Sequence, residues 1–366
     1  MRFHVLGLSH TRTDPSYSVC AFTQKILALC RMLHDRGHEV YHYGTAGSVP
    51  VCSEHVEVLS NETFRRVHEA YDYKAAGFLV SRDNDAWREF AQRAIAAVQR
   101  RSQPGDFLLC TFGLDHQPIA QALPHLIAVE SGIGYPHTFA KYRVWESYAW
   151  MHMAYGKEGH FDNPPWYDAV IPAAFDLEDY PASPRQLKYH VFLGRPTVLK
   201  GREIAIQVCR ELHIPLYVAG QGDRTVPEGV VHLGVLDATQ RATCLSQAQA
   251  LWAPTYYIEP FGQVAVQAQL CGTPVIATDF GAFPETVEHG IGGYRCRTYE
   301  QFVWAAQHVG DLSRAEIRCR AQARYSLARV AAMYEEYFDM LTRLYSDPAG
   351  WYTRNTGRTE LNWLNR

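Results

Sequence analysis

The feature that most constrains the fold is an alternation of short apolar segments with amphipathic segments, which starts at the N-terminus and restarts near residue 170. Residues 3–8 are predicted to form a buried strand, 19–36 an amphipathic helix that Gly37 ends, and 39–43 the next strand. A strand, a helix and a second strand in this order form a βαβ unit, which places the two strands in parallel. The pattern therefore predicts an α/β protein built on parallel sheets.

The restart divides the chain into two domains. A chain of 366 residues is long for one typical domain, and residues 189–194 open a second set of strands and helices after a proline-rich stretch. We expect an N-terminal domain over 1–175, a C-terminal domain over 176–345, and a tail, 346–366, that is a candidate to cross back over the N-terminal domain. The predicted architecture is two doubly wound, Rossmann-like domains that face each other across a cleft, with ligands at the carboxyl ends of the strands.

Composition and charge exclude several classes of protein. The net charge of −3 gives no global electrostatic reason to bind nucleic acid or an anionic membrane. No apolar run approaches the 18 or so residues that a membrane helix needs, and the N-terminus lacks the apolar stretch of a signal peptide. The nine cysteines are scattered and never spaced as CxxC, which favours reduced core thiols. We therefore expect a cytoplasmic protein without a transmembrane segment.

The most informative segment runs from 253 to 296. It contains EPFG, formed by Glu259, Pro260, Phe261 and Gly262, followed by GTPVIA at 272–277, GAFPE at 281–285 and HGIGG at 289–293. The order and spacing of these motifs resemble the glycosyl transferases group 1, the retaining glycosyltransferase family 4. This resemblance implies a GT-B fold, in which the first domain, 1–175, binds the acceptor and the second, 176–345, binds a nucleotide-sugar donor, with UDP-sugars favoured.

The physical chemistry of this segment agrees with such a site. Gly262 precedes a predicted helix that begins at Gln263, and a helix N-terminus offers free N–H groups and partial positive charge to a phosphate. The Glu259 carboxylate can accept hydrogen bonds from sugar hydroxyls. The family has a glutamate at the position of Gln267 to hold the ribose hydroxyls, and the amide here lacks the charge-assisted component. Gly281 would let the backbone approach the donor, whereas Glu285 is either a donor ligand or a helix cap.

A second motif, GRPTVLKG, starts at Gly194 and contains Arg195 and Lys200. It resembles the family's G-R-x4-K-G, whose two cations neutralise the nucleotide diphosphate as it leaves. Gly220 and Val235 occupy the positions where the family packs the nucleotide base. The resemblance thus assigns both motifs to the donor.

The N-terminal half matches the family less well. The loop after the first strand lacks the family's glycine-rich sequence, but the βα topology places Ser9 and His10 near the cleft as donor contacts. His116 resembles the family histidine that faces the transferred sugar. Residues 131–167 are rich in aromatic side chains interleaved with cations, including Tyr135, Lys141, Arg143 and Trp145. Such a stripe is either core or an acceptor site, where aromatic faces suit sugar rings or extruded bases.

Together these features predict a metal-independent, retaining glycosyltransferase that moves a hexose-type sugar to a hydroxyl acceptor. Glu259 would orient the sugar, Arg195 and Lys200 would stabilise the departing diphosphate, and the nucleotide sugar would be a co-substrate rather than a cofactor. A glycan or lipid acceptor is expected, and the alternative acceptor is a hydroxymethylated base in DNA. A nucleotide-sugar epimerase and a non-catalytic nucleotide-sugar-binding protein are the alternatives from other classes.

Overall fold

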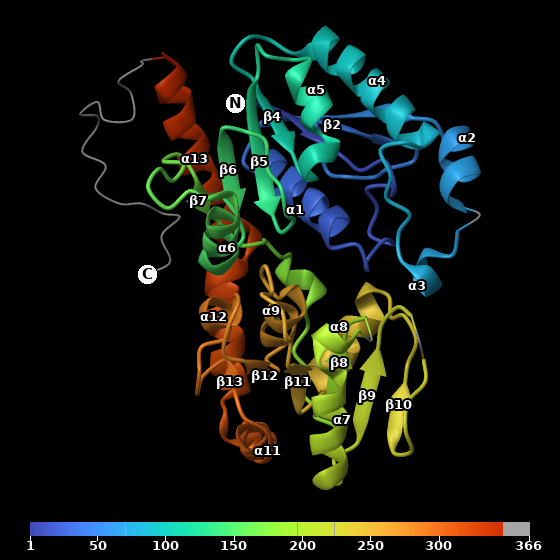
Figure 1. The fold of residues 1–366 in the computed structure, drawn as a ribbon, viewed down its shortest axis with the longest axis vertical. Helices are drawn as coiled ribbons and strands as arrows, with labels where there is room; N and C mark the ends of the chain where they lie inside the picture. The colour runs from blue at the N-terminus through green and yellow to red at the C-terminus, as the bar shows by residue number, and fades with distance from the viewer. Residues whose placement is uncertain (70, 196, 223, 347–366) are drawn as a thin grey trace.

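Two parallel sheets form the centres of two domains that lie one above the other in Figure 1. The computed structural model describes residues 1–346 except 70, 196 and 223. The N-terminal sheet has seven strands in the order β3-β2-β1-β4-β5-β6-β7, and the C-terminal sheet has six in the order β10-β9-β8-β11-β12-β13. Every pairing between neighbouring strands in both sheets is parallel. The prediction of two doubly wound α/β domains is confirmed.

The N-terminal domain buries its sheet between helices. Its strands are β1 (Arg2–Leu6), β2 (Glu39–Thr45), β3 (Glu54–Leu59), β4 (Phe107–Cys110), β5 (Ile127–Ile133), β6 (Tyr142–Trp145) and β7 (Ala169–Val170). Its helices are α1 (Ala21–Asp35), α2 (Asn61–Phe64), α3 (Tyr73–Ala76), α4 (Asp85–Arg101), α5 (Gln117–Gln121) and α6 (Tyr148–Glu158), and a π-helical turn covers Arg65–Glu69. All four residues of β4 and of β6 are buried, as is typical of strands covered on both faces.

The C-terminal domain repeats this design with shorter elements. Its strands are β8 (His190–Leu193), β9 (Leu216–Ala219), β10 (Val230–His232), β11 (Ala250–Ala253), β12 (Val275–Thr278) and β13 (Gly293–Cys296). Its helices are α7 (Arg202–Glu211), α8 (Ala238–Gln247), α9 (Gln263–Leu270), α10 (Phe283–Thr286), α11 (Tyr299–His308) and α12 (Arg314–Tyr325). Asp237 and Gln240 start α8 with a capping box, in which each side chain bonds the other residue's backbone N–H.

The chain crosses between the domains twice, and the two crossings lie side by side. The Phe175 N–H donates to the Tyr325 carbonyl at 2.9 Å, and the Leu327 N–H donates to the Phe175 carbonyl at 3.2 Å. The first crossing lies at Phe175. The second comes earlier than the sequence suggested, because the chain returns to the N-terminal domain at residue 327 rather than after 345.

The returning segment is the helix α13 (Leu327–Ser346), which rises along the N-terminal domain in Figure 1. Its apolar face joins the N-terminal core, where the ring of Phe338 lies 4.7 Å from that of Phe3 and 4.9 Å from that of Phe107. The Tyr337 hydroxyl donates to the Tyr167 carbonyl at 2.7 Å. The predicted role of the tail concerns residues 347–366, which lie outside the described residues. Within the described part of the chain, none of the helices combines the length and apolar character that a bilayer crossing needs.

Candidate active site

A cleft of about 680 Å³ lies between the two domains, with the carboxyl ends of strands from both sheets around it. Its C-terminal wall contains most of the predicted donor residues, namely Gly194, Arg195, Lys200, Gly220, Val235, Glu259, Pro260, Phe261, Gly262, Gln263 and Gln267. The two motifs that were read from the sequence therefore meet at one place. The geometry supports their grouping as one site.

Glu259 is held in place by two donors from its own domain. Its Oε2 atom accepts hydrogen bonds from the Lys200 Nζ and from the Tyr257 hydroxyl, both at 2.7 Å. Burial, followed by the Glu259 charge and this hydrogen bond, raises the pKa of Tyr257, so the phenol stays protonated and remains a donor. The Lys200 Nζ also lies 4.9 Å from the centroid of the Tyr257 ring.

Glycines allow the loops around Glu259 to approach each other. Gly201 has φ 70°, and a Cβ there would lie 2.0 Å from the Pro254 carbonyl oxygen, so the loop after β8 packs directly on the loop after β11. Gly281 has φ 64°, and a Cβ there would lie 2.8 Å from the Glu259 nitrogen. Gly281 does not line the cleft; it packs against the backbone of the EPFG loop at Glu259.

Helix α9 begins directly after Gly262, and its first residues, Gln263 and Val264, line the cleft. The free N–H groups and partial positive charge of this N-terminus can bind an anion. Farther along α9, Gln267 is buried, and its Oε1 atom has no hydrogen-bond partner among the described residues. A buried amide oxygen that faces the cleft in this way fits a ligand hydroxyl.

The N-terminal wall of the cleft contains an ion pair that the sequence motifs did not indicate. Lys25 from α1 and Glu146, which directly follows β6, form a 2.7 Å contact between Nζ and Oε2. The Lys25 Nζ also donates to the Gly132 carbonyl at 3.2 Å and lies 4.4 Å from the centroid of the Phe22 ring. Burial raises the pKa of Glu146, an effect that Lys25 opposes and that the Glu259 charge reinforces. The position of Glu146 just after a parallel strand was an available signal, whereas Lys25 lies inside an ordinary amphipathic helix.

Polar contacts join the two walls. The Ser147 hydroxyl donates to the Pro260 carbonyl at 2.6 Å. Glu285 accepts hydrogen bonds from the N–H groups of Tyr148 and Ala149 at 2.9 and 2.8 Å, so it caps α6 of the opposite domain. Of the two roles left open for Glu285, the structure shows the helix cap, and Glu285 does not line the cleft.

The predicted sugar-facing histidine lies away from the cleft. His116 is buried, its Nδ1 accepts the Thr111 N–H at 3.1 Å, and its Nε2 lies 2.9 Å from the Gly7 carbonyl. Burial lowers the pKa of His116 to about 4, so the ring is neutral and both nitrogens are used by the backbone. His116 therefore stabilises the turn after β4 and does not reach a ligand in the cleft.

Ser9 and His10 are also buried and are not part of the cleft lining. His10 lines a separate cavity of about 410 Å³. Its ring lies 5.7 Å from that of Phe78 and 5.0 Å from that of Phe112, and burial lowers its pKa to about 3. The prediction that these two residues contact the donor does not fit the geometry, because both side chains are buried outside the cleft lining, although Ser18 and Val19 farther along the same loop do line the cleft.

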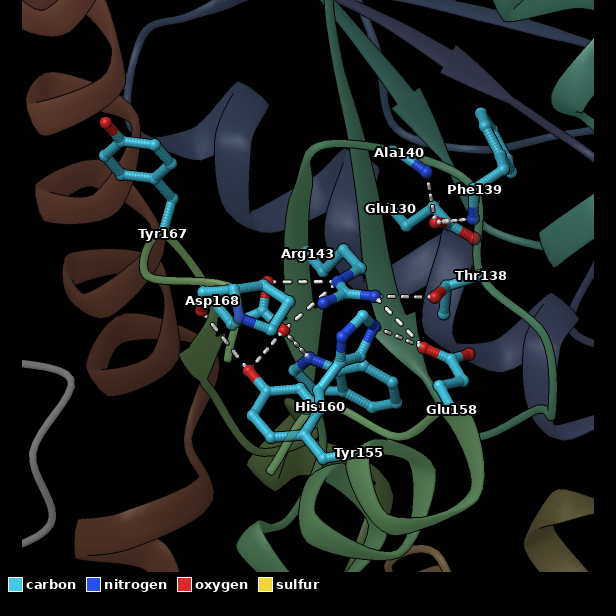
Figure 2. A network of polar contacts seen from close by, with 12 residues as sticks. Glu130, Thr138, Phe139, Ala140, Arg143, Tyr155, Glu158, His160, Tyr167 and Asp168 are labelled. Atoms are coloured by element: carbon cyan, nitrogen blue, oxygen red, sulfur yellow. Dashed lines mark hydrogen bonds and ion pairs between the residues drawn. The ribbon is translucent and has the colours of Figure 1, made fainter. Parts of the chain in front are cut away.

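The predicted acceptor residues belong mainly to a buried polar network, part of which Figure 2 shows. The Arg143 Nε donates to both Asp168 oxygens at 3.0 and 3.1 Å, and its Nη1 donates to the Thr138 hydroxyl at 2.8 Å. The Trp145 indole N–H donates to Asp168 at 2.6 Å. Arg143 is 5% and Trp145 is 0% exposed. Both side chains are therefore committed to the fold.

The other two residues predicted to bind the acceptor, Tyr135 and Lys141, also lie outside the cleft lining. The Tyr135 hydroxyl donates to Glu130 Oε1 at 3.1 Å, and burial raises the pKa of Glu130 to about 7. Lys141 is exposed and lies 5.3 Å from the ring centroids of Tyr142 and Tyr167, outside the cleft lining. The aromatic segment is therefore divided: Tyr135, Tyr142 and Trp145 are core residues, because strand β6 and its neighbours are covered on both faces. Trp150 instead lines the cleft, and Phe161 and Trp166 are exposed.

In the described part of the chain, no group of three or more His, Cys, Asp or Glu side chains could hold a metal ion. The cations of the cleft are instead side chains of the protein, among them Arg195, Lys200 and Lys25. Arg241 also lines the cleft, and its Nη1 donates to the Ser18 carbonyl of the opposite domain at 3.1 Å.

Comparisons with known proteins find similarity mainly in the sequence of the C-terminal domain. Residues 188–311 match the family model described as glycosyl transferases group 1. The D-inositol 3-phosphate glycosyltransferase of Mycolicibacterium gilvum is 31% identical over 141 residues, which cover 34% of this chain and 32% of that protein. The chain thus spans about a third of the length of the curated relatives it matches.

Solved structures extend the similarity to both domains. AviGT4, a glycosyltransferase involved in avilamycin A biosynthesis, has a TM-score of 0.67 at 19% identity and covers 93% of this chain and 98% of its own. HepE from Anabaena, solved in complex with UDP and glucose, has a TM-score of 0.65 at 15% identity, with 93% and 99% covered. Residues 188–311 thus match the glycosyl transferases group 1 family model, and the two domains together have the GT-B fold.

Proposed function

We propose that the chain transfers a hexose-type sugar from a UDP-sugar to a hydroxyl group of an acceptor, with retention of anomeric configuration. The observation that carries this proposal is the Lys200–Glu259 pair, which lies beside the N-terminus of α9 in the interdomain cleft. The family match over 188–311 and the UDP bound to HepE support the choice of donor.

In this proposal each part of the C-terminal wall contacts one part of the donor. The N-terminus of α9, Arg195 and Lys200 bind the diphosphate, because they bring positive charge and N–H groups to one side of the cleft. Gln267 accepts from a ribose hydroxyl through its buried Oε1. Gly220 and Val235, which line the cleft, contact the base, and Glu259 orients the sugar hydroxyls.

The proposed reaction needs no nucleophile from the protein and no metal. The bond between the sugar C1 and the diphosphate oxygen breaks, and the electron pair leaves with the diphosphate. The acceptor oxygen bonds C1 on the same face, and its proton passes to the departing diphosphate. Arg195 and Lys200 stabilise the negative charge that develops on that group, a role worth about 3 kcal/mol for one well-placed donor in other enzymes.

We also propose a cytoplasmic location, since all nine cysteines are free thiols and seven of them are buried. The alternative acceptor, a base in DNA, was suggested by Arg143, Trp145 and Tyr135. These side chains are buried in the fold and therefore no longer support it. A glycan or other hydroxylated small molecule remains the proposed acceptor.

The test is thermal stabilisation of the protein by UDP, UDP-glucose, GDP and ADP, since a ligand of the native state raises the melting temperature by mass action. We expect UDP and UDP-glucose to stabilise the wild type and Lys157→Met, a lysine change on an exposed part of α6. Lys200→Met and Glu259→Ala are expected to weaken UDP-glucose binding at least tenfold. Stabilisation by no nucleotide, or stabilisation unchanged in Lys200→Met, would contradict the proposal.

Turnover separates the remaining alternatives. UDP release from UDP-glucose that depends on an added hydroxyl acceptor supports a transferase. Conversion of the sugar to an epimer without any acceptor indicates an epimerase instead. Donor binding without either reaction, across a broad panel of glycans, indicates a non-catalytic binding protein.

A further inference from the structure

The N-terminal wall of the cleft has the composition of a carbohydrate-binding surface. Phe22 and Trp150 each bring an aromatic ring to it, and both are half-buried. The Trp150 indole N–H donates to the Tyr135 carbonyl at 3.3 Å, and the Phe22 ring meets that of Phe112 edge-on at 4.9 Å. The two rings are therefore fixed, and fixed aromatic faces suit the apolar faces of sugar rings.

One carboxylate oxygen of Glu146 has no hydrogen-bond partner among the described residues. Its Oε2 is paired with Lys25, but its Oε1 is buried and has no hydrogen-bond partner among the described residues. A buried polar atom without a hydrogen bond costs free energy. An ionised carboxylate can only accept hydrogen bonds, so the group that satisfies Oε1 must be a donor, such as a hydroxyl.

Glu146 lies near the EPFG loop, which is proposed to hold the sugar of the donor. A Cβ at Gly134 would lie 2.6 Å from Glu146 Oε2 and 3.5 Å from Pro260 Cβ, so Glu146 lies close to the EPFG loop. Ser147 holds the same loop through the Pro260 carbonyl. Glu146 thus lies opposite the predicted donor wall, where an acceptor would meet the sugar.

We propose that Phe22, Lys25, Glu146 and Trp150 bind an uncharged, polyhydroxylated acceptor, and that Glu146 Oε1 accepts a hydrogen bond from an acceptor hydroxyl next to the one that attacks. The proposal rests on the proposed transferase function and names its acceptor class. Lys25 holds Glu146 Oε2 in place and favours its ionised form against the effect of burial. The proton of the attacking hydroxyl still passes to the diphosphate, so Glu146 orients the acceptor and takes no proton.

This wall also selects against an anionic acceptor. Glu146 is already close enough to Glu259 for the two charges to interact, and Lys25 is committed to Glu146. A phosphate beside Glu146 would add a third negative charge to a partly desolvated site. The acceptor would then differ from the inositol 3-phosphate in the names of the curated relatives.

The experiment measures binding of small polyols to the protein saturated with UDP, by ligand-observed NMR. The probes are methyl α-glucoside, myo-inositol and, as a matched anion, myo-inositol 3-phosphate. Glu146→Gln tests the hydrogen bond, because the amide turns its oxygen to Lys25 and presents N–H groups in place of Oε1. Glu300→Gln and Lys157→Met are controls, since both residues are exposed and outside the cleft lining.

We expect at least one neutral probe to bind the wild type more tightly than the anion does. Glu146→Gln and Lys25→Met should weaken that binding at least tenfold, with UDP affinity kept within twofold and the controls unchanged. The inference is overturned if no neutral probe binds, if the anion binds more tightly, or if Glu146→Gln binds like the wild type. Failure of UDP itself to bind would instead count against the proposed function on which the inference rests.

Discussion

The cleft contains two lysine–glutamate pairs, one from each domain, which are alike in local geometry and different in what surrounds them. In both pairs the lysine Nζ lies 2.7 Å from the glutamate Oε2. Both lysines also lie over an aromatic ring, Lys25 over Phe22 at 4.4 Å and Lys200 over Tyr257 at 4.9 Å. The two pairs differ in the burial of the carboxylate and in its other hydrogen-bond partners.

The N-terminal carboxylate is deeper and less satisfied than the C-terminal one. The Glu146 side chain is 3% exposed and that of Glu259 is 13% exposed. Glu259 has a second partner in the Tyr257 hydroxyl, whereas Glu146 Oε1 has no partner among the described residues. The comparison teaches that Glu259 has two hydrogen bonds already made within its domain, while Glu146 keeps one buried oxygen unused. Under the proposed function the first pair would hold the donor and the second would accept from a further ligand.

The largest expected effect is on stability, and it distinguishes the two lysines. Lys25→Met leaves the Glu146 charge buried and unpaired, which should lower the free energy of unfolding by about 3 kcal/mol. Lys200→Met leaves Glu259 with Tyr257 and with more access to water, so the expected loss is about 1 kcal/mol. Urea denaturation of both variants, without ligand, measures the difference.

A double variant sharpens this prediction. Lys25→Met combined with Glu146→Leu removes the stranded charge and should recover a large part of the stability that Lys25→Met loses. Equal losses for Lys25→Met and Lys200→Met, or no recovery in the double variant, would mean that the two pairs are energetically equivalent despite their different burial.

The next effect concerns two glycines, one behind each pair. In Gly134→Ala the new Cβ would meet Glu146 Oε2 at 2.6 Å, so we expect the carboxylate to shift and neutral polyols to bind about tenfold more weakly. In Gly281→Ala the new Cβ would meet the Glu259 nitrogen at 2.8 Å in a backbone with φ 64°, so UDP-glucose binding should weaken instead. Binding titrations of both ligands to both variants check this crossed pattern, and a variant that weakens both ligands equally would break it.

The smallest expected effect tests the contact between the walls. Ser147→Ala removes the 2.6 Å hydrogen bond to the Pro260 carbonyl and the hydroxyl that accepts the Trp150 N–H at the start of α6. Each such bond contributes about 1 kcal/mol. We expect a modest fall in melting temperature and a similar, small weakening of UDP-glucose and polyol binding. An effect on only one ligand would show that Ser147 belongs to one wall rather than to their junction.

Sequence reasoning predicted the C-terminal wall well and the N-terminal wall poorly. Gly194, Arg195, Lys200 and the EPFG residues all line the cleft, because each lies in a short loop directly after a buried strand. In the N-terminal half, both ring nitrogens of His116 are used by Gly7 and Thr111, and the Nε atom of Arg143 is used by Asp168. A sequence shows which side chains carry polar groups, but it does not show which of those groups the fold has already satisfied.

By itself the sequence determined two parallel α/β domains and the contiguous motifs that line one wall of the cleft. These depend on periodicity and on spacing within one loop, which are local properties of the chain. Only the tertiary structure decided that α13 joins the N-terminal core, that Glu285 caps α6 of the other domain, and that Lys25 meets Glu146. Those contacts join residues more than 100 positions apart, and their partners are chosen by burial and distance in space, which no local pattern encodes.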